Sequence, residues 1–126
     1  MMPARFWRDQ RGATILEFAL TVPIFFALIF GIIGGGLLLW MQLGLQHGAE
    51  MAARCAGVNT SICGSVSAIQ NYAASQAYGL NPSPSVFSVS TPACGNQVSA
   101  SYSFQFFTSY AGIPSLTLTA RSCFPT

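Results

Sequence analysis

The stretch that decides the fold is Arg8–Trp40, "RDQRGATILEFALTVPIFFALIFGIIGGGLLLW". It begins with basic residues and continues as an apolar run, and from Phe18 to Ala49 the chain has no Asp, Glu, Lys or Arg. An apolar run of about 18 residues or more predicts a transmembrane helix, which we place at about residues 18–41. Glu17 stands at the start of this run, although a charge at the centre of a membrane helix costs about 2.5–3.5 kcal/mol, and less near its ends. Its carboxylate either reaches back to the headgroups or to Arg11, or it has a functional role.

The composition is unlike that of an ordinary soluble protein. Of the 126 residues, 52% are hydrophobic and 6% are charged, and all five basic residues are arginines. This is too little charge for a water-facing surface. About 80 residues follow the apolar run, enough for one small domain whose core needs support from disulfides or a partner. The sequence therefore predicts one membrane helix and one small domain.

The charges lie unevenly on the two sides of the apolar run. Arg5, Arg8 and Arg11 precede it, and the charged residues that follow are Glu50, Arg54 and Arg121. By the positive-inside rule the N-terminus stays cytoplasmic and the rest of the chain crosses the membrane. Three spaced arginines make a poor nucleic-acid surface, so we expect no nucleic-acid partner.

A single long helix is predicted from Ala13 to about Ala56, interrupted by a kink at Pro23. Residues 1–12 form a basic leader, with Gly12 as a flexible joint. At 1.5 Å per residue the helix is about 65 Å long, and only about half of it fits in a bilayer. The remainder projects outward with a stripe of small residues that a sheet or helix can pack against: Ala49, Ala52, Ala53 and Ala56.

Smaller features of this helix have competing interpretations. Gly31 with Gly35, and Gly44 with Gly48, have G-x-x-x-G spacing and predict helix contact faces, although this spacing also arises by chance in glycine-rich segments. Trp40 is typical of an aromatic anchor at the outer membrane interface. Glu50 and Arg54, at i and i+4, are expected to form a surface ion pair.

Residues 57–126 are predicted to form an α/β head. "SVSAIQNYAASQAYGL" (65–80) has the spacing of a second, amphipathic helix, ended by Gly79 and "NPSPS". Three segments then alternate apolar and polar residues as strands do: "SVFSVS" (85–90), "QVSASYSFQFF" (97–107) and "SLTLTARS" (115–122). We expect a three-stranded antiparallel sheet with a hairpin through "TSYAGIP" (108–114), and hence an α+β fold.

Four cysteines, Cys55, Cys63, Cys94 and Cys123, all follow the apolar run. An even count in a small exported domain favours two disulfides, with free structural thiols as the alternative. A zinc site needs closer ligands than these, since the shortest separation is eight positions, so we expect no metal. A hairpin turn near Tyr110 places Cys94 beside Cys123 and leaves Cys55 to pair with Cys63, while the other two connectivities stay open.

The sequence lacks the parts of an enzyme. Besides Glu17 and Glu50 the only acid is Asp9, in the leader. His47 has no nearby nucleophile, carboxylate pair or thiol, and no Ser-His-Asp or Cys-His-Asn set is available in the exported region. We therefore predict neither catalysis nor a cofactor, and interpret His47 as an ordinary polar helix residue.

The motif "RGATILEF" (11–18) resembles the processing site of type IV prepilins of the Flp and Tad class. In these proteins a membrane-embedded prepilin peptidase cuts after a glycine, and a glutamate is the fifth residue of the mature chain. The resemblance continues through "GATILEFALTVPIFFALIFGI" to "AARCAG", covers residues 11–56, and is to TadE-like proteins, which are minor pilins or pseudopilins of tight-adherence systems. It implies a cut between Gly12 and Ala13, and assembly through Glu17 with the aromatic Phe18 after it.

The residue types suit these roles physically. A glycine lets the leader enter a protease site in an extended conformation, and the arginines hold the scissile bond at the membrane surface. The cut frees an ammonium on Ala13, which the resemblance pairs with Glu17 of an adjacent subunit. An unpaired carboxylate in a low dielectric is costly, so this pairing also sets the register between subunits.

The resemblance implies a single-pass inner-membrane precursor with a cytoplasmic N-terminus, a periplasmic head, and an extracellular location if the subunit enters the pilus. Its implied partners are a prepilin peptidase, other pilin and pseudopilin subunits bound through the N-terminal helix, the inner-membrane assembly platform of the pilus, and the lipid bilayer. The sizeable head favours a minor, tip or initiator subunit of a pilus for adhesion or secretion. The alternative is an uncleaved, signal-anchored periplasmic binding module.

Overall fold

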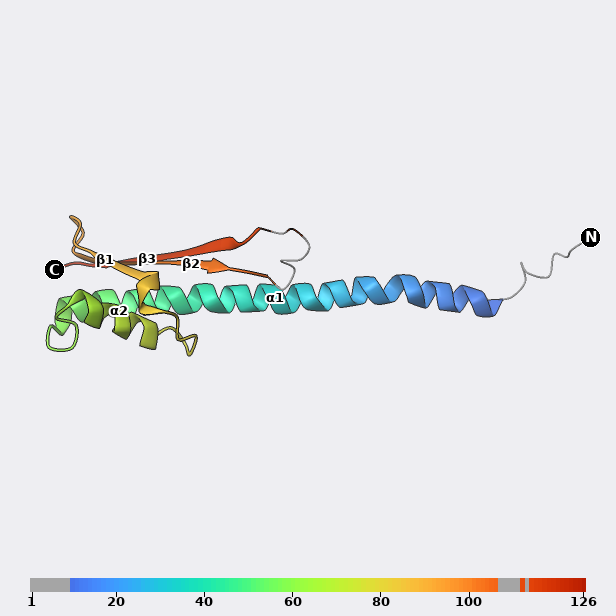
Figure 1. Ribbon diagram of the computed structural model, residues 1–126, viewed down its shortest axis with the longest axis horizontal. Helices are drawn as coiled ribbons and strands as arrows, with labels where there is room; N and C mark the ends of the chain where they lie inside the picture. The colour runs from blue at the N-terminus through green and yellow to red at the C-terminus, as the bar shows by residue number, and fades with distance from the viewer. Residues whose placement is uncertain (1–9, 107–111, 113) are drawn as a thin grey trace, which may run out of the picture. The chain divides into compact units, whose positions relative to one another are not determined.

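The computed structural model describes residues 10–106, 112 and 114–126, with side chains described from residue 12. By its internal contacts the chain divides into two compact units, Met1–Gly35 and Gly36–Thr126. The first unit contains the N-terminal half of a long helix. The second contains the other half of that helix and all of the head, and its elements are drawn in Figure 1.

Helix α1, Gln10–Val58, belongs to both units. It begins three residues before the predicted Ala13, so Gly12 is helical and does not form the expected joint. One glycine costs a helix about 1 kcal/mol relative to alanine, too little to end it by itself. Helix α1 also continues through Pro23 without interruption. Just before the proline, the Thr21 hydroxyl donates a hydrogen bond of 2.7 Å to the backbone carbonyl of Glu17.

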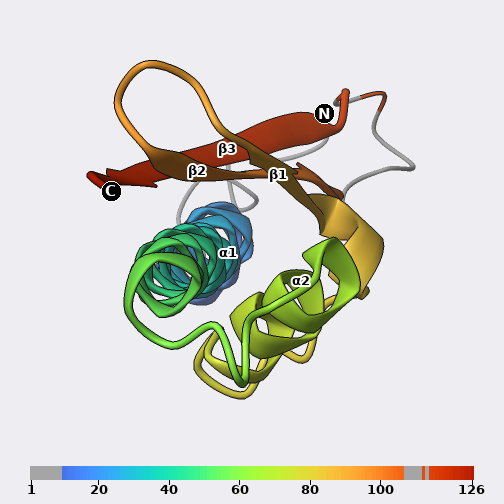
Figure 2. The ribbon, with the colours of Figure 1, turned by 90° about the vertical axis from the view of Figure 1, so that its left-hand side faces the viewer.

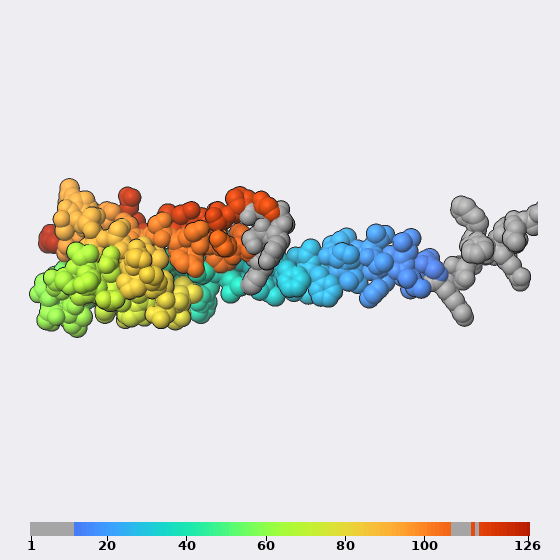
Figure 3. All heavy atoms as spheres, in the orientation of Figure 1, coloured from blue at the N-terminus to red at the C-terminus, as the bar shows by residue number. Residues whose placement is uncertain are grey.

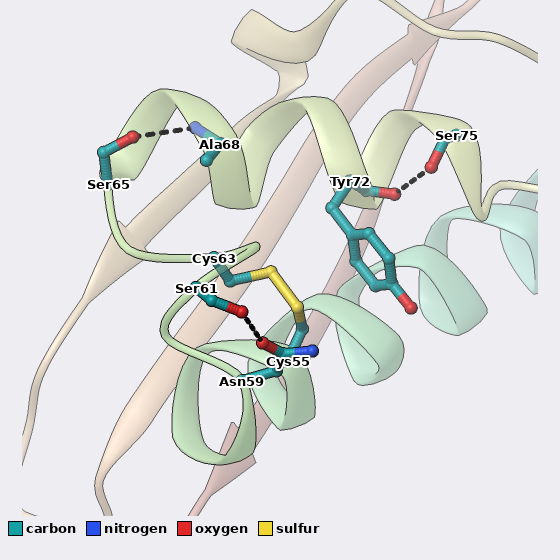
Figure 4. Close-up of a disulfide and its surroundings, with 8 residues drawn as sticks. All are labelled: Cys55, Asn59, Ser61, Cys63, Ser65, Ala68, Tyr72 and Ser75. Carbon is teal, nitrogen blue, oxygen red and sulfur yellow. Dashed lines mark hydrogen bonds between the residues drawn. A yellow bond between two sulfur atoms is a disulfide. The ribbon is translucent and has the colours of Figure 1, made fainter.

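Helix α2, Val66–Ser75, begins at an N-cap serine. The Ser65 hydroxyl accepts a hydrogen bond of 3.2 Å from the backbone N–H of Ala68, as Figure 4 shows. The helix ends at Ser75, earlier than predicted. The turn that follows has positive φ at Tyr78 (48°) and Gly79 (75°), which no α-helix accommodates.

A short 3-10 turn, η2 (Pro84–Val86), leads into the sheet of β1 (Phe87–Ser90), β2 (Asn96–Phe104) and β3 (Leu116–Phe124). The strands are antiparallel in the order β1-β2-β3. The predicted α+β fold with a three-stranded antiparallel sheet is therefore confirmed. The predicted hairpin turn falls mostly on residues 107–111 and 113, which lie outside the described residues.

The alternation in the strands places apolar side chains on one face of the sheet. Figure 2 shows α1 and α2 side by side beneath this face. The buried strand residues are Phe87, Val98, Ala100, Phe104, Leu118 and Ala120, and they form one core with the buried residues of the two helices. On α1 the predicted small-residue stripe packs into this core, since Ala49, Ala52 and Ala53 are fully buried and Ala56 is partly buried.

The head contains two disulfides, and their connectivity is the one that the hairpin register favoured. Gln97 pairs with Cys123 across β2 and β3, which brings Cys94 next to its partner. The Cys94–Cys123 Cα atoms are 6.3 Å apart. Cys55 and Cys63, whose Cα atoms are 5.8 Å apart, close the loop between α1 and α2 (Figure 4).

Glutamine side chains from the helices bind both edges of the sheet. Gln42 donates a hydrogen bond of 2.8 Å to the Thr119 carbonyl of β3, and Gln46 donates one of 3.3 Å to the Arg121 carbonyl. On the opposite edge, Gln70 of α2 donates one of 2.7 Å to the Phe87 carbonyl of β1. These bonds occupy edge acceptors that otherwise template pairing with another chain.

One predicted contact is wrong. The Glu50 carboxylate accepts a hydrogen bond of 2.9 Å from the Gln46 amide. No ion pair with Arg54 forms among the residues that the structure describes. An exposed i, i+4 ion pair is worth only about 0.3–0.5 kcal/mol, so a neighbouring amide competes with it easily.

Candidate functional site

The N-terminal half of α1 exposes an apolar surface. Between residues 12 and 33 every residue except Val22 and Ile29 is exposed, although nearly all are apolar. In the space-filling view of Figure 3 these side chains, in blue, form the surface of the segment. The most exposed large side chains are Ile15 (71%), Phe18 (70%), Ile24 (69%) and Ile32 (68%).

This helix can cross a membrane by length and composition. Within Gly12–Val58 the most apolar window has a mean hydropathy of 2.5, and aromatic rings run along one part of it. Phe26 and Phe30 stack with ring centroids 6.2 Å apart, and Phe25 meets Phe26 edge-on at 5.9 Å. Exposed apolar surface on this scale is typical of a site that contacts a membrane or another protein.

Glu17 is the one acid in this apolar half. It lies on helix α1, five residues after Gly12, and its side chain is exposed. Within the described part of the chain, its hydrogen bonding is limited to the backbone carbonyl that accepts from Thr21. Among the described residues the carboxylate itself makes no hydrogen bond.

Gly12 has no structural explanation within the described residues. A methyl group built on it would meet no atom within 4 Å, so packing does not require a glycine. Its backbone is helical, whereas the described glycines with positive φ are Gly79, Gly95 and Gly112. Within the described residues, neither space nor conformation therefore demands glycine at this position.

The two glycine pairs of α1 differ sharply. A methyl group on Gly44 would lie 2.6 Å from Leu80 Cδ1 and 3.1 Å from the Ala77 carbonyl oxygen. On Gly48 it would lie 2.6 Å from the Ala73 carbonyl oxygen and 3.3 Å from the Phe87 ring. This pair is therefore the contact face for α2 and the turn after it.

Gly31 and Gly35 have the same spacing, yet methyl groups built on them would meet nothing within 4 Å among the described atoms. The predicted contact face is thus found at Gly44 and Gly48 within this chain. Gly31 and Gly35 are not contacted by any other part of the chain among the described residues.

Sequence reasoning missed Tyr78. Its ring stacks on His47, with centroids 4.4 Å apart and planes 11° from parallel, and lies 6.4 Å from the ring of Trp40. His47 is accordingly a packing residue on the surface of the head. A tyrosine with positive φ is rare, so no sequence pattern pointed to this position.

The described residues hold no group of three or more His, Cys, Asp or Glu side chains that could bind a metal. The four cysteines are all joined in disulfides.

Comparison with known proteins finds one family match, and it falls on helix α1. Residues 12–54 match the model of the family described as TadE-like protein. No curated protein and no solved structure matches the chain. The match begins at Gly12, includes Glu17 and both glycine pairs, and ends before the first disulfide. Residues 12–54, which form most of helix α1, are therefore similar to the TadE-like family.

Proposed function

We propose that this protein is a minor pilin or pseudopilin that a prepilin peptidase processes and that takes part in assembling a pilus of the Tad/Flp type, for adhesion or secretion. The observation that carries the proposal is the placement of Glu17. It is an exposed acid on an apolar helix, five residues after a glycine that this fold does not require. TadE-like proteins are structural components of pili, and no catalytic role is proposed.

Processing is proposed to occur between Gly12 and Ala13. Both residues are helical, whereas a peptide bond must become accessible in an extended chain to be hydrolysed. The first turn of α1 therefore has to unwind in the protease. Glycine favours this step because it is the weakest helix former after proline and because it brings no β-carbon into the site.

Assembly is proposed to occur through the apolar half of α1. The cut would leave an ammonium on Ala13, and Glu17 of a neighbouring subunit would accept it as a charge-assisted hydrogen bond. In lipid or in a helix bundle a mismatched register leaves both charges unpaired, which is strongly unfavourable. Phe18 and the open Gly31 and Gly35 face would add packing between helices.

The same proposal sets the location and partners. The precursor is a single-pass inner-membrane protein with its basic leader in the cytoplasm and its disulfide-joined head in the periplasm, where disulfides persist. Besides the peptidase it contacts other pilin and pseudopilin subunits and the inner-membrane assembly platform. Once assembled, the subunit would lie in the extracellular pilus.

The test is the intact mass of the protein extracted from membranes of cells that possess a prepilin peptidase. We expect a chain that begins at Ala13. Gly12→Phe should retain residues 1–12, because a bulky side chain blocks the cut. Gly31→Phe is the matched control, since it alters an equally open helical glycine and should be processed normally. A native chain with its leader intact would instead support the uncleaved, signal-anchored binding module.

A further inference from the structure

An aromatic cluster on the head is not used by the proposed assembly. It consists of Trp40 on α1 and Tyr78 in the turn after α2, with His47 stacked on the tyrosine. Trp40 is 56% exposed and Tyr78 is 52% exposed. About half of the surface of each residue is therefore covered by the head, and the other half is exposed.

The backbone holds Tyr78 in this position at a cost. Its φ is 48°, and Asn81 three residues later has φ 44°. A left-handed conformation costs a residue other than glycine about 1–2 kcal/mol. Strained residues of this kind cluster at functional sites. Here it turns a large ring outward beside Trp40.

Hydrogen bonds and close contacts locate this cluster along the head. The Gln42 and Gln46 bonds to Thr119 and Arg121 show that β3 runs in the same direction as α1. Leu116, three residues before Thr119, therefore lies about 10 Å nearer the N-terminal side of α1. Figure 1 shows the turn after α2 reaching toward the same end of the head.

This end of the head carries no charge among the described residues. The charged side chains of residues 36–106, 112 and 114–126 are Glu50, Arg54 and Arg121. The first two follow Gln46 on α1, and the carbonyl of the third binds Gln46. The exposed residues at the uncharged end are instead apolar or aromatic: Leu37, Leu39, Trp40, Leu43, Tyr78 and Leu116.

The uncharged end falls at the depth of a membrane boundary. A bilayer core of about 30 Å takes about 20 helical residues, so a span that begins at Phe18 ends near Leu37. The headgroup layer adds about 5–7 Å on each side, which is about three to five helical residues and reaches Trp40. Tryptophan and tyrosine are the side chains enriched in this layer, because each combines an apolar ring with a polar group.

We propose that this end of the head, centred on Tyr78 and Trp40 with Leu116 on the sheet side, binds the headgroup layer of the phospholipid bilayer. The head then rests in the membrane surface and does not stand away from it on a bare helix. This inference rests on the membrane insertion in the proposed function. It is independent of the cut after Gly12 and of assembly.

Tryptophan fluorescence in vesicles tests it. The full chain is reconstituted in phosphatidylcholine and phosphatidylglycerol, with or without phosphatidylcholine brominated near the headgroup end of its acyl chains. Trp7→Phe leaves Trp40 as the sole tryptophan. Three further variants add Trp40→Phe and place a new tryptophan elsewhere. Tyr78→Trp puts the probe in the cluster, and Leu116→Trp puts it on the sheet side. Ile62→Trp puts it at an exposed site (55%) next to the loop disulfide. Intact disulfides, checked by mass, verify folding of each variant.

We expect bromolipid to quench Trp40 and the Tyr78→Trp and Leu116→Trp probes at least about threefold more than the Ile62→Trp probe. If Trp40 is quenched but neither head probe exceeds the Ile62→Trp probe, the helix inserts and this inference is wrong. If Trp40 is not quenched either, the membrane insertion in the proposed function fails together with the inference. If Tyr78→Trp alone disturbs the fold, the Leu116→Trp probe decides the question.

Discussion

The two halves of helix α1 carry the same glycine spacing and use it differently. Gly44 and Gly48 touch α2 and the turn after it, and Gly31 and Gly35 touch nothing among the described residues. The half with contacts also carries the alanines that are buried under the sheet. A G-x-x-x-G pattern therefore marks a helix face that can be approached closely, but it does not say whether the approaching helix belongs to the same chain.

The same contrast holds for the two acids that follow Gly12. Glu50 lies on the half that carries the head and accepts a hydrogen bond from Gln46. Glu17 lies on the exposed apolar half. We expect Glu17→Ala to reduce pilus assembly at least about tenfold, since removing one member of a charge pair in a low dielectric leaves the other unmatched. Pilus yield by shearing and immunoblot measures this.

Glu50→Ala is the matched control and should assemble normally. Both variants should be inserted and processed like the native chain. Normal assembly of the Glu17→Ala variant would remove the proposed role of that carboxylate.

The disulfides should matter only to the half that carries the head. Replacing Cys94 and Cys123 together by serine should lower the free energy of unfolding by about 3.6 kcal/mol, from the entropy of the larger loop. Replacing Cys55 and Cys63 should lower it by about 2.5 kcal/mol. Denaturant unfolding of the detergent-solubilised chain, followed by tyrosine and tryptophan signals, measures both. If both replacements lowered the free energy of unfolding equally, loop length would not determine how much each disulfide stabilises the head.

A single methyl group should separate the two glycine pairs. Gly48→Ala places a methyl 2.6 Å from the Ala73 carbonyl oxygen, so α1 and α2 must shift, at a cost of about 1–3 kcal/mol. Gly31→Ala meets no atom of the described residues and should leave the stability of the head unchanged. The same unfolding experiment compares them, and a Gly48→Ala variant as stable as the native chain would contradict the contact.

The smallest expected effect concerns the sheet edge. Gln70→Ala removes the hydrogen bond to the Phe87 carbonyl and should cost about 1 kcal/mol. Asn71→Ala, on the exposed face of the same helix, is the control and should change stability by less than about 0.5 kcal/mol. A larger loss at Asn71 than at Gln70 would argue against edge capping as a source of stability.

Much of the fold followed from local patterns. The period of two in residues 97–107 and 115–122 fixed which side chains of β2 and β3 face the core, and the hairpin register then favoured one disulfide connectivity. The small residues from Ala49 to Ala56 correctly predicted a packing face on α1. These features depend on neighbours along the chain or across one hairpin, which sequence spacing reports directly.

Other features depended on tertiary contacts. The Gln46 amide replaced the predicted Glu50–Arg54 pair, and α2 ended early because of the turn at Tyr78. Helix α1 also passed through Gly12, where a joint was predicted, since one weak helix former does not end a helix. At the candidate site, Gly12 and Glu17 remain predictions from spacing and resemblance, whereas the stacking of Tyr78 on His47 had no signal in the sequence.

The proposed division of α1 into a half that carries the head and a half that other subunits cover is tested most directly by photo-crosslinking in assembling cells. p-Benzoylphenylalanine would replace Phe18 (70% exposed), Phe30 (66%) or Val58 (69%). These sites are equally exposed in the isolated chain, but the first two lie on the apolar half. We predict crosslinks to pilin subunits from Phe18 and Phe30 and few from Val58. Crosslinks from Val58 alone, or lipid-only adducts at Phe18 and Phe30 in assembled pili, would contradict the account.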